Sequence, residues 1–274
     1  NLCVEKATDG GEDFIWVGSN GTISGNDYTN NKTFSRIRFQ PKTTFEHYTG
    51  ENFYLSSYTD ASGTKWSVHN LQVTPDFEHR RLLVTASTTT SSKRHCIVYN
   101  LDDVLALKEQ SITLTLTWGG ETDTGTTRKE GKVTLNARVL DSLTPLGSFR
   151  IASSLNSKDY SKTWSCSFQG QAIYGDKIYW YEGQPLEKVS GSGVYDNARA
   201  YLEVFDYNGK RLAPRTRVAA ISDFDNMKRL LNLNENLFSE AEGMQIKEGG
   251  TKLYLGVTTH LAGATTKNRL STIL

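Results

Sequence analysis

Two glutamates, Glu240 and Glu242, stand two residues apart near the C-terminal end, in the stretch SEAEGMQIKEGGTKLYLGVTTH. The apolar residues after them alternate with polar ones, and this period of two is that of a β-strand. On one face of a regular strand, two such carboxylates would lie about 6.5–7 Å apart. Inverting glycosidases place their two carboxyl groups about 6.5–9.5 Å apart. The pair is therefore a candidate for glycan cleavage. The alternative is that both acids only contact solvent or a neighbouring loop.

The same phrase recurs along the chain: a polar residue, a short strand with apolar residues, a turn, and a second strand rich in Leu, Tyr and Ile. Its polar position holds Asn70, Gln169 and Glu242, and a fainter copy near the start has Glu5 there. Repeated small antiparallel units predict a β-propeller, in which the first strand of each blade lines a central channel. The four polar side chains would then meet at one mouth of the channel. They either bond neighbouring blades there or contact a ligand.

Short alternating runs separated by polar loops predict antiparallel hairpins along the whole chain. These hairpins join residues 13–19 to 34–40, 79–88 to 94–101, 176–183 to 199–212, and 251–260 to 268–274. Further strands are expected within residues 111–120, 131–140 and 147–155. Only residues 101–109 and 222–233 have a helical pattern with plausible ends. We therefore expect an all-β protein with two short helices.

Aromatic residues precede two of the polar positions. Trp66 stands four residues before Asn70, and Trp164 stands five residues before Gln169. Sugars stack on aromatic faces, while amides and carboxylates bond their hydroxyl groups. The alternative is that both rings only pack between blades. The candidate ligand-binding residues at the channel mouth are Glu5, Trp66, His69, Asn70, Trp164, Gln169, Glu240 and Glu242.

Composition excludes several classes of function. The net charge of +1 gives no sign of a basic surface that would bind nucleic acid. The sequence contains no run of 18 apolar residues, which a membrane-spanning helix would need. We find no nucleophile elbow, P-loop or dinucleotide fingerprint, and no metal-ligand spacing, so no cofactor or metal is expected.

Cys3, Cys96 and Cys166 are either buried thiols or one disulfide and a free thiol. Abundant Thr, Ser, Asn and Gly are typical of a secreted or surface-exposed protein. The sequons at Asn20 and Asn31 are interpreted as plain loop residues.

Several stretches carry a resemblance to a known family. They are GEDFIWVG, SRIRF, VTPD with IVYNLDDV, SFQG, and SEAEGMQI with YLGVTTH, in this order over nearly the whole chain. The chain resembles the helveticin J family of secreted bacteriocins, the teichoic acid biosynthesis protein C group, and the propeller of some phage receptor-binding proteins. The resemblance implies one domain over residues 1–274, a five-bladed β-propeller. It also implies a secreted protein that binds a cell-surface glycan, such as a teichoic-acid-like polymer, as part of an antibacterial activity.

Two other functions stay open at this point. One is a glycan-cleaving or glycan-modifying enzyme that uses Glu240 and Glu242, and the other is a structural module that docks to a protein. The chain also departs from the family at its start, because family members carry several further strands before the position of Asn1. We expect these strands to come from a cleaved N-terminal fragment or a second subunit.

Mass spectrometry of the intact, undissociated protein tests this expectation. We expect to detect the chain in complex with a fragment or a second subunit, because closure of the propeller removes exposed strand edges. Each buried backbone group left unpaired would cost about 1–3 kcal/mol. A folded monomer of 30.6 kDa with both edges free would contradict the expectation.

Overall fold

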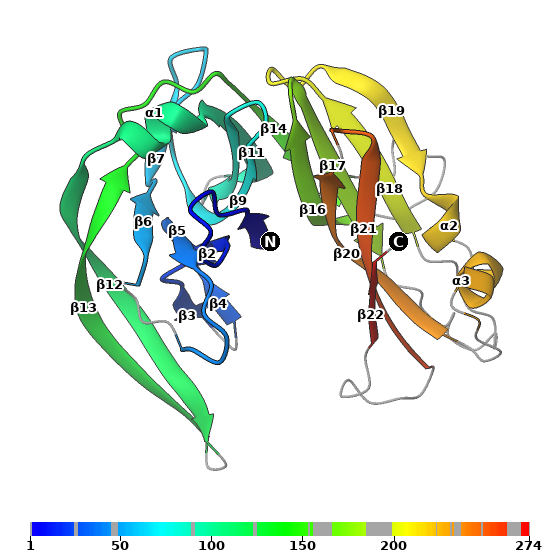
Figure 1. Cartoon of the computed structure of the whole chain (residues 1–274), viewed down its shortest axis with the longest axis horizontal. Helices are drawn as coiled ribbons and strands as arrows, with labels where there is room; N and C mark the ends of the chain where they lie inside the picture. The colour runs from blue at the N-terminus through cyan, green and yellow to red at the C-terminus, as the bar shows by residue number, and fades with distance from the viewer. Residues whose placement is uncertain are drawn as a thin grey trace. The chain divides into compact units, whose positions relative to one another are not determined.

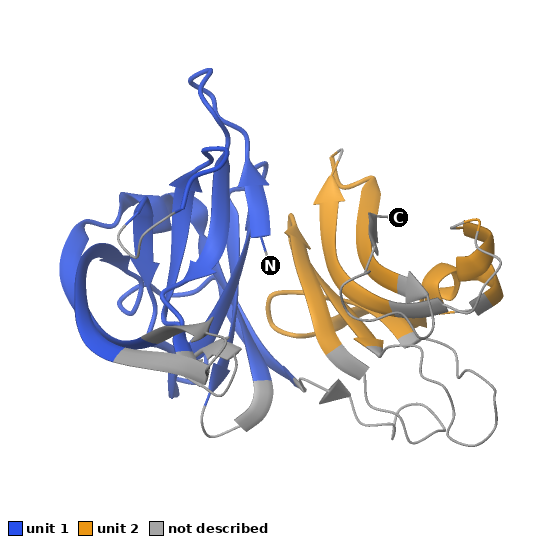
Figure 2. Cartoon of the chain, turned by 90° about the horizontal axis from the view of Figure 1, so that it is seen from below, with its two compact units in different colours: residues 1–151 blue, residues 152–274 orange. Residues whose placement is uncertain are grey.

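The protein is mostly β-structure, arranged as several antiparallel sheets (Figure 1). The computed structural model describes residues 2–273 except 25–26, 45–48, 89–90, 123–124, 153, 156–165, 185–198, 223, 231, 233–236, 248 and 262–269. The chain divides into two compact units, residues 1–151 and residues 152–274 (Figure 2). Each unit is described by itself. No helix in the described part of the chain is both long and apolar enough to cross a membrane.

Unit 1 holds two large sheets. The first sheet has the order β1 (Leu2–Glu5), β2 (Phe14–Ser19), β5 (Thr33–Arg38), β6 (Glu51–Tyr54), β13 (Gly125–Val139) and β12 (Glu109–Thr122). The second sheet has the order β9 (His69–Asp76), β10 (Arg81–Thr88), β11 (Ser91–Asn100) and β14 (Gly147–Ala152). Two small hairpins accompany them: β3 (Thr22–Ser24) with β4 (Asp27–Thr29), and β7 (Ser57–Thr59) with β8 (Lys65–Ser67).

Unit 2 also holds two sheets. The third sheet has the order β15 (Ser154–Leu155), β16 (Cys166–Tyr174), β17 (Lys177–Gln184), β18 (Arg199–Phe205) and β19 (Arg211–Arg217). The fourth sheet consists of β20 (Leu237–Lys247), β21 (Lys252–Leu261) and β22 (Leu270–Ile273). Helices α2 (Ala219–Ser222) and α3 (Phe224–Leu230) lie between these sheets in sequence. Unit 2 packs around a core that includes Tyr181, Ala241 and Val257.

All four hairpins expected from the sequence are confirmed as antiparallel pairs. They are β2 with β5, β10 with β11, β17 with β18, and β21 with β22. The two expected helical segments are also helical, but they are shorter. The first is α1 (Leu101–Ala106), whose N-cap Asn100 accepts hydrogen bonds from the backbone N–H groups of Asp102 and Asp103. The second corresponds to α3, whereas α2 lies just before it and overlaps the expected segment only at Ser222. The described residues contain no other helix.

A stack of aromatic rings fills the core of unit 1. Trp16, Phe34 and Phe53, on β2, β5 and β6, are all fully buried. The ring centroids of Trp16 and Phe53 lie 5.3 Å apart, and those of Phe34 and Phe53 lie 4.9 Å apart. Cys3 and Cys96 are buried free thiols, and burial raises the pKa of Cys3 to about 11. These two cysteines therefore form no disulfide with each other. The side chain of Cys166 lies outside the described residues.

A chain of ion pairs crosses the first sheet from strand to strand. Arg36 on β5 bonds Glu5 on β1, with 2.7 Å between Nε and Oε2, and also bonds Glu51 on β6. Arg138 on β13 lies 2.7 Å from Glu51 and 3.8 Å from Glu109 on β12. Such a network holds its members more firmly than isolated surface pairs would. It links five of the six strands of this sheet.

The recurring polar positions of the sequence coincide with irregularities in the strand ladders. Between β16 and β17, Phe168 faces Glu182 and Gly170 faces Tyr181, so Gln169 is an extra residue. Between β20 and β21, Glu242 is the extra residue in the same way, directly before Gly243. An inserted residue of this kind is a β-bulge, which bends the strand and increases its twist. The repeat read from the sequence therefore has a structural counterpart.

The second sheet has its bulge at the equivalent place. Between β9 and β10, His69 faces Ser87 and Gln72 faces Thr85, so Asn70 and Leu71 together oppose one residue. The number of residue pairs between the bulge and the turn that follows it is the same in all three hairpins. In all three sheets the bulge lies on the strand that begins the hairpin. The bulges are thus a shared feature of both units.

The two bulges of unit 2 lie against each other. A Cβ atom added to Gly170 would lie 2.9 Å from the Cα atom of Gly243. The absence of a side chain at Gly170 therefore lets β16 and β20 pack closely. Within the described part of unit 2, β16 contacts β20 more than any strand outside its own sheet.

The Gly170→Ala variant tests this contact. Its Cβ atom would collide with backbone, which cannot move aside as a side chain can, so we expect the free energy of unfolding to fall by about 1–3 kcal/mol. Gly243→Ala is the matched control, since its added Cβ atom meets nothing within 4 Å. Urea denaturation of both variants gives the comparison. Equal stabilities of the two variants would contradict the close packing of β16 on β20.

Both faces of the second and third sheets are buried. In the second sheet, Val84 and Ile97 lie on one face and Leu83 and Val98 on the other, and all four are fully buried. In the third sheet, Tyr181 lies on the face that packs in the core of unit 2, and Trp180 on the opposite face is equally buried. A sheet with one solvated face would instead alternate buried and exposed residues. These two sheets are therefore covered on both sides.

The face of the third sheet that contains Trp180 also carries charged side chains. Glu182 and Glu203, on β17 and β18, have fully buried side chains. Arg215 Nη2 lies 2.7 Å from Glu182 Oε2, and Arg211 Nε lies 2.8 Å from Glu203 Oε2. Trp180 Nε1 donates a further hydrogen bond to Glu182 Oε1 at 3.1 Å. Burial nevertheless raises the pKa of Glu182 to about 7.

A histidine is buried between the β7–β8 hairpin and the second sheet. His95 on β11 is fully buried, and its Nδ1 lies 2.7 Å from the hydroxyl of Tyr58. Its Nε2 has no hydrogen-bond partner among the described residues. The ring of Trp66 packs against it with 5.0 Å between centroids, and Arg150 stacks on Trp66. Burial, followed by the charge of Arg150, lowers the pKa of His95 to about 4.

The His95 pKa predicts how stability depends on pH. Between about pH 6.5 and pH 4, the unfolded chain binds a proton at His95 that the folded chain does not. The contribution to stability is full above this window and is lost as the pH falls through it, by up to about 3 kcal/mol. The measurement is the free energy of unfolding against pH for the wild type and for His95→Gln. We expect a flatter profile in the variant, and parallel profiles would contradict the assignment.

Candidate functional site

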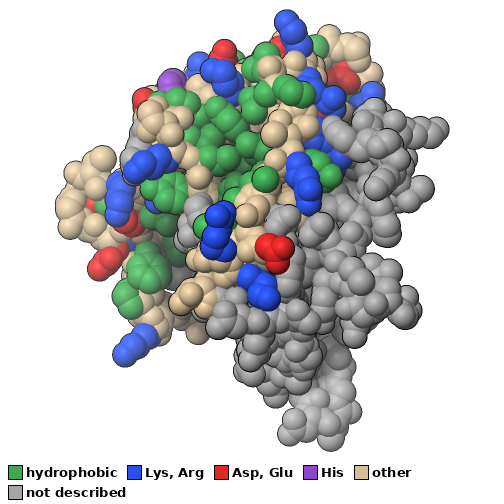
Figure 3. All heavy atoms as spheres, turned by 90° about the vertical axis from the view of Figure 1, so that its right-hand side faces the viewer, with side chains coloured by type: hydrophobic (Ala, Val, Ile, Leu, Met, Phe, Trp, Pro, Cys, Tyr) green, Lys and Arg blue, Asp and Glu red, His purple; other side chains and the backbone are tan. Residues whose placement is uncertain are grey.

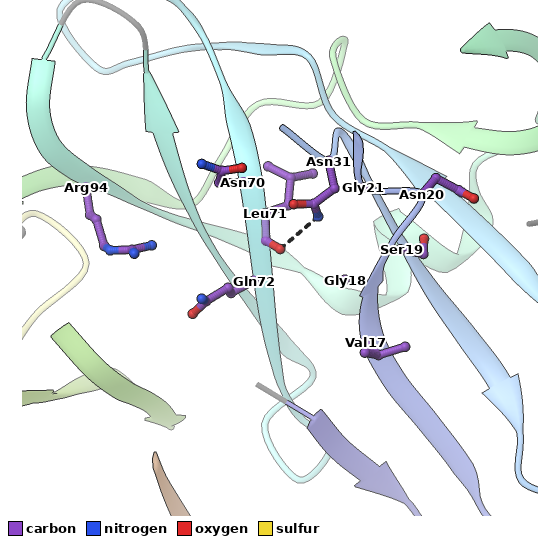
Figure 4. A pocket seen from close by; sticks show the side chains of 10 residues that line it. All are labelled: Val17, Gly18, Ser19, Asn20, Gly21, Asn31, Asn70, Leu71, Gln72 and Arg94. Atoms are coloured by element: carbon purple, nitrogen blue, oxygen red, sulfur yellow. Dashed lines mark hydrogen bonds between the residues drawn. The ribbon is translucent and has the colours of Figure 1, made fainter. Parts of the chain in front are cut away.

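A polar pocket of about 480 Å³ opens in unit 1 beside the bulge of β9 (Figure 4). Its size lies in the range of small-molecule sites in proteins. One wall is the end of β2 and the turn after it, and the other is the start of β9. Its polar lining residues are Ser19, Asn20, Asn31, Asn70, Gln72 and Arg94. We take this pocket as the candidate site because it combines a concave surface with one of the polar positions found in the sequence.

Asparagines shape the backbone around the pocket. Asn20 has a φ angle of 52° and Asn70 one of 53°, in the left-handed region. Asparagine tolerates this region better than other residues with a side chain. The side-chain oxygen of Asn70 accepts a hydrogen bond from the backbone N–H of Asn30. This bond fixes the bulge of β9 against the loop that precedes β5.

Close packing joins the two walls of the pocket. A Cβ atom added to Gly18 would lie 2.9 Å from the carbonyl oxygen of Leu71, so only glycine fits here without movement of the backbone. The side chain of Asn31 bridges the same gap, because its Nδ2 donates to the carbonyl oxygens of Thr33 and Leu71, both at 3.0 Å. Figure 4 shows the bond from Asn31 to Leu71 across the pocket wall. The pocket is therefore held in shape by the backbone.

These bonds also bear on the two sequons. The Nδ2 atom of Asn31 uses both of its hydrogens, and an attached glycan would replace one of them. Asn20 Nδ2 donates to Thr33 Oγ1 at 3.0 Å. The side chain of Asn31 therefore has a structural role. This favours the interpretation of the sequons as plain loop residues.

Arg94 provides the charge of the pocket. The register of the second sheet aligns Gln72 with Thr85 and Cys96, and Arg94, two residues before Cys96, lines the pocket together with Gln72. Figure 4 shows Arg94 and Gln72 reaching toward the same part of the pocket. Burial lowers the pKa of Arg94, but a guanidinium stays protonated at neutral pH. Arg94 is the one charged side chain in the described lining, which contains no acidic residue.

The chemistry of the pocket suits a hydroxyl-rich ligand with a negative charge. Amide side chains donate and accept hydrogen bonds at the same time, as sugar hydroxyls require. A guanidinium matches the geometry of a carboxylate or a phosphate, which it can bond through two N–H groups. No residue of the described lining is arranged as a nucleophile with a neighbouring base. The pocket therefore has the features of a binding site.

Glu5, the first of the sequence candidates, is held within the first sheet. Its carboxylate accepts hydrogen bonds from Trp16 Nε1 at 2.8 Å and from Arg36 Nε at 2.7 Å. It lies at the end of β1, facing Phe14. These contacts correspond to the structural alternative, in which the polar position bonds its neighbours.

Trp66 and His69 lie near the second sheet, outside the described lining of the pocket. Trp66 Nε1 donates to Asp60 Oδ2 at 2.8 Å, and Arg150 stacks on the ring, 4.6 Å from its centroid. His69 is half-buried beside Asn70, and burial lowers its pKa. The stacking of Arg150 occupies one face of the Trp66 ring, on which a sugar was expected to stack.

Gln169 and Glu240 meet in unit 2. Gln169 Nε2 donates to Glu240 Oε1 at 3.4 Å, beside the contact of the two bulges. Glu240 is half-buried and Glu242 is exposed. The separation of 6.5–7 Å expected for the two carboxylates assumed a regular strand. The bulge at Glu242 interrupts that alternation, so this estimate does not apply.

The proposed ring of polar residues spans both units. Asn70 belongs to unit 1, while Gln169 and Glu242 belong to unit 2. Their gathering around one channel mouth therefore stays a prediction. Trp164 lies outside the described residues.

The sequence contains a weak signal for the pocket. Asn20 and Gly21 form an Asn-Gly pair, which is typical of a turn, but it does not indicate what the turn contacts. Arg94 and Gln72 meet only through the register of three strands, which no local pattern reveals. The models of known protein families and the sequences of curated proteins show no match to this chain.

A patch of apolar surface is also present. Figure 3 shows hydrophobic side chains gathered among lysines and arginines on one face of the molecule. The exposed large hydrophobic residues of unit 2, in the described part of the chain, are Leu212 on β19 and Leu230 at the end of α3. The protein-docking alternative would depend on surface of this kind.

Proposed function

We propose that this protein is a β-propeller that binds a negatively charged cell-surface glycan in the pocket around Asn70 and Arg94. The observation that carries the proposal is the place of Asn70. This residue occupies the recurring polar position of the sequence, and it lines a pocket whose other polar groups are amides, a hydroxyl and a guanidinium. These groups suit sugar hydroxyls and an acidic substituent, such as the phosphate of a teichoic-acid-like polymer.

Three features support the propeller. Strands β9 to β11 of the second sheet and β16 to β19 of the third are meanders in which consecutive strands lie side by side. The bulged strand comes first in each hairpin of the repeat, as the innermost strand of a blade would. The second and third sheets bury both of their faces, as propeller blades between two neighbouring blades do. A five-bladed propeller would need strands beyond the four sheets, from a cleaved fragment or a second subunit.

Secretion and an antibacterial role belong to the same proposal. They are supported by the resemblance to secreted bacteriocins and by a composition rich in Thr, Ser, Asn and Gly. An anionic polymer of a bacterial wall would be met only outside the cell. The glycan-cleaving alternative loses its main geometric argument, because the bulge at Glu242 breaks the regular spacing on which it depended.

Binding to purified cell-wall polymers tests the proposal. We expect binding to a phosphate-containing wall polymer, weaker binding to a neutral polysaccharide, and no release of hydrolysis products. Arg94→Met should raise the Kd at least tenfold, which corresponds to about 1.4 kcal/mol. Asn70→Gly should also weaken binding, and glycine tolerates the left-handed backbone of this position.

The matched control is Arg80→Met. Arg80 is a partly exposed arginine outside the described lining of the pocket, paired with Asp102. It carries the same charge as Arg94, so the control separates the pocket from the net charge of the protein. Thermal unfolding of each variant shows that the fold is kept. Equal loss of binding in Arg80→Met and Arg94→Met would contradict the proposed site.

A further inference from the structure

A second pocket of unit 1 lies where the β12–β13 ribbon leaves the first sheet. β13 pairs with β6 at only two positions, Arg138 with Phe53 and Val139 with Tyr54. In contrast, β12 and β13 pair with each other from Glu109 to Thr122. The ribbon therefore diverges from β6 before Arg138. The pocket has a volume of about 350 Å³ and is lined by Gly50, Asn52, Glu109, Thr134, Leu135 and Asn136.

The wall formed by β6 is fixed in place. Asn52 is 2% exposed, its Oδ1 accepts a hydrogen bond from Ser35 Oγ at 2.8 Å, and its Nδ2 donates to the carbonyl oxygen of Gly50. Gly50 has a φ angle of 79°, and a Cβ atom there would lie 2.6 Å from the carbonyl oxygen of Arg36. The wall formed by β6 is thus rigid before any ligand arrives, which lowers the entropy cost of binding.

The wall formed by the ribbon presents small polar groups. Thr134 faces Thr113 across the ribbon, with 3.1 Å between their Oγ1 atoms, and Asn136 faces Ser111. Thr134 and Asn136 are exposed, whereas Leu135 between them is buried on the other face of the ribbon. The alternation of the strand therefore directs a hydroxyl and an amide to the same side.

Glu109 is the one charged residue in the described lining of this pocket. Its side chain is 46% exposed and lies 3.8 Å from Arg138 Nη1. That same nitrogen is closer to Glu51, at 2.7 Å, so Arg138 is engaged mainly by the other carboxylate. No Lys or Arg lines this pocket. Its charge is therefore opposite to that of the Arg94 pocket.

We propose that this pocket is a second ligand site, which takes an amino sugar with an unsubstituted ammonium group. Glu109 pairs with the ammonium, while the amide of Asn136 and the hydroxyl of Thr134 bond the sugar hydroxyls. A volume of about 350 Å³ accommodates a ligand of this size. The site shares no lining residue with the Arg94 pocket, and it stands whether or not that pocket binds a glycan.

The experiment is an NMR titration of the protein with glucosamine and with N-acetylglucosamine at about pH 6, where an amine of this kind is protonated. We expect glucosamine to shift the backbone amide signals of Gly50, Thr134 and Asn136. N-acetylglucosamine should bind at least tenfold more weakly, because its nitrogen carries no charge. Glu109→Gln should weaken glucosamine binding at least tenfold and remove the preference between the two sugars.

Glu130→Gln is the matched control. Glu130 is an exposed carboxylate on the same strand as Thr134, outside the described lining of the pocket. We expect it to bind glucosamine as the wild type does. Thermal unfolding of both variants shows whether the ribbon is intact.

Three outcomes would overturn the inference: no shift at Gly50, Thr134 and Asn136, equal affinity for the two sugars, or unchanged binding in Glu109→Gln. The signals of Gly18 and Asn70 report the Arg94 pocket in the same spectra. Shifts confined to these two residues would refute the second site and leave the proposed function untouched. Failure of a wall polymer to bind would affect only the proposed function.

Discussion

Close approach of backbones at the β-bulges is the constraint on which both units depend. In unit 1 the Cα of Gly18 lies against the carbonyl of Leu71, and in unit 2 Gly170 lies against Gly243. A bulge turns the strand and adds twist, and the glycine removes the side chain that would separate the strands. Sheets can pack this closely only where both conditions are met. The polar side chains of the bulges, Asn70 and Gln169, then lie beside the contact between sheets.

The same constraint accounts for the location of the candidate pocket. A bulge leaves a residue outside the regular ladder, so its side chain is available for other contacts. At Asn70 the neighbouring strands leave an open space, and at Gln169 the space is occupied by the contact with Glu240. One recurring element of the sequence therefore has two uses, a pocket wall in unit 1 and a bond between sheets in unit 2.

Buried polar groups connect the surroundings of the two pockets of unit 1. The hydroxyl of Ser19, which lines the Arg94 pocket, lies 2.7 Å from that of Ser35, and Ser35 Oγ lies 2.8 Å from Asn52 Oδ1 of the second pocket. Ser35 and Asn52 are almost fully buried, so their bonds are shielded from water. This network fixes the walls of both pockets to one rigid sheet. Binding sites on such a scaffold lose little entropy when a ligand arrives.

Features that depend on neighbouring residues in sequence could be predicted, and those that depend on distant strands could not. The four hairpins were found because alternation and polar loops are local signals. Asn70 was found through repetition. Arg94 was missed because it lies close to Gln72 only through the pairing of three strands. The parallel contact of β13 with β6 joins segments far apart in sequence and leaves no pattern in either.

The Glu240–Glu242 pair shows why local spacing alone can mislead. Two residues apart on a regular strand means one face and a known distance. One inserted residue removes both conclusions, and the pattern of apolar and polar residues around Glu242 does not distinguish a bulge from a regular strand. Gly243 is the only local hint, since a glycine inside a strand often marks such a site.

Two buried titratable groups, one in each unit, respond to acid in opposite directions. Burial holds the pKa of Glu182 at about 7, above its usual value of 4.5, so the folded form keeps a proton there that the unfolded chain has released. Its contribution to stability is full below about pH 4.5 and is lost as the pH rises toward 7. His95 contributes with the opposite sign over nearly the same range. As the pH falls through this range, the contribution of Glu182 to stability therefore grows while that of His95 is lost.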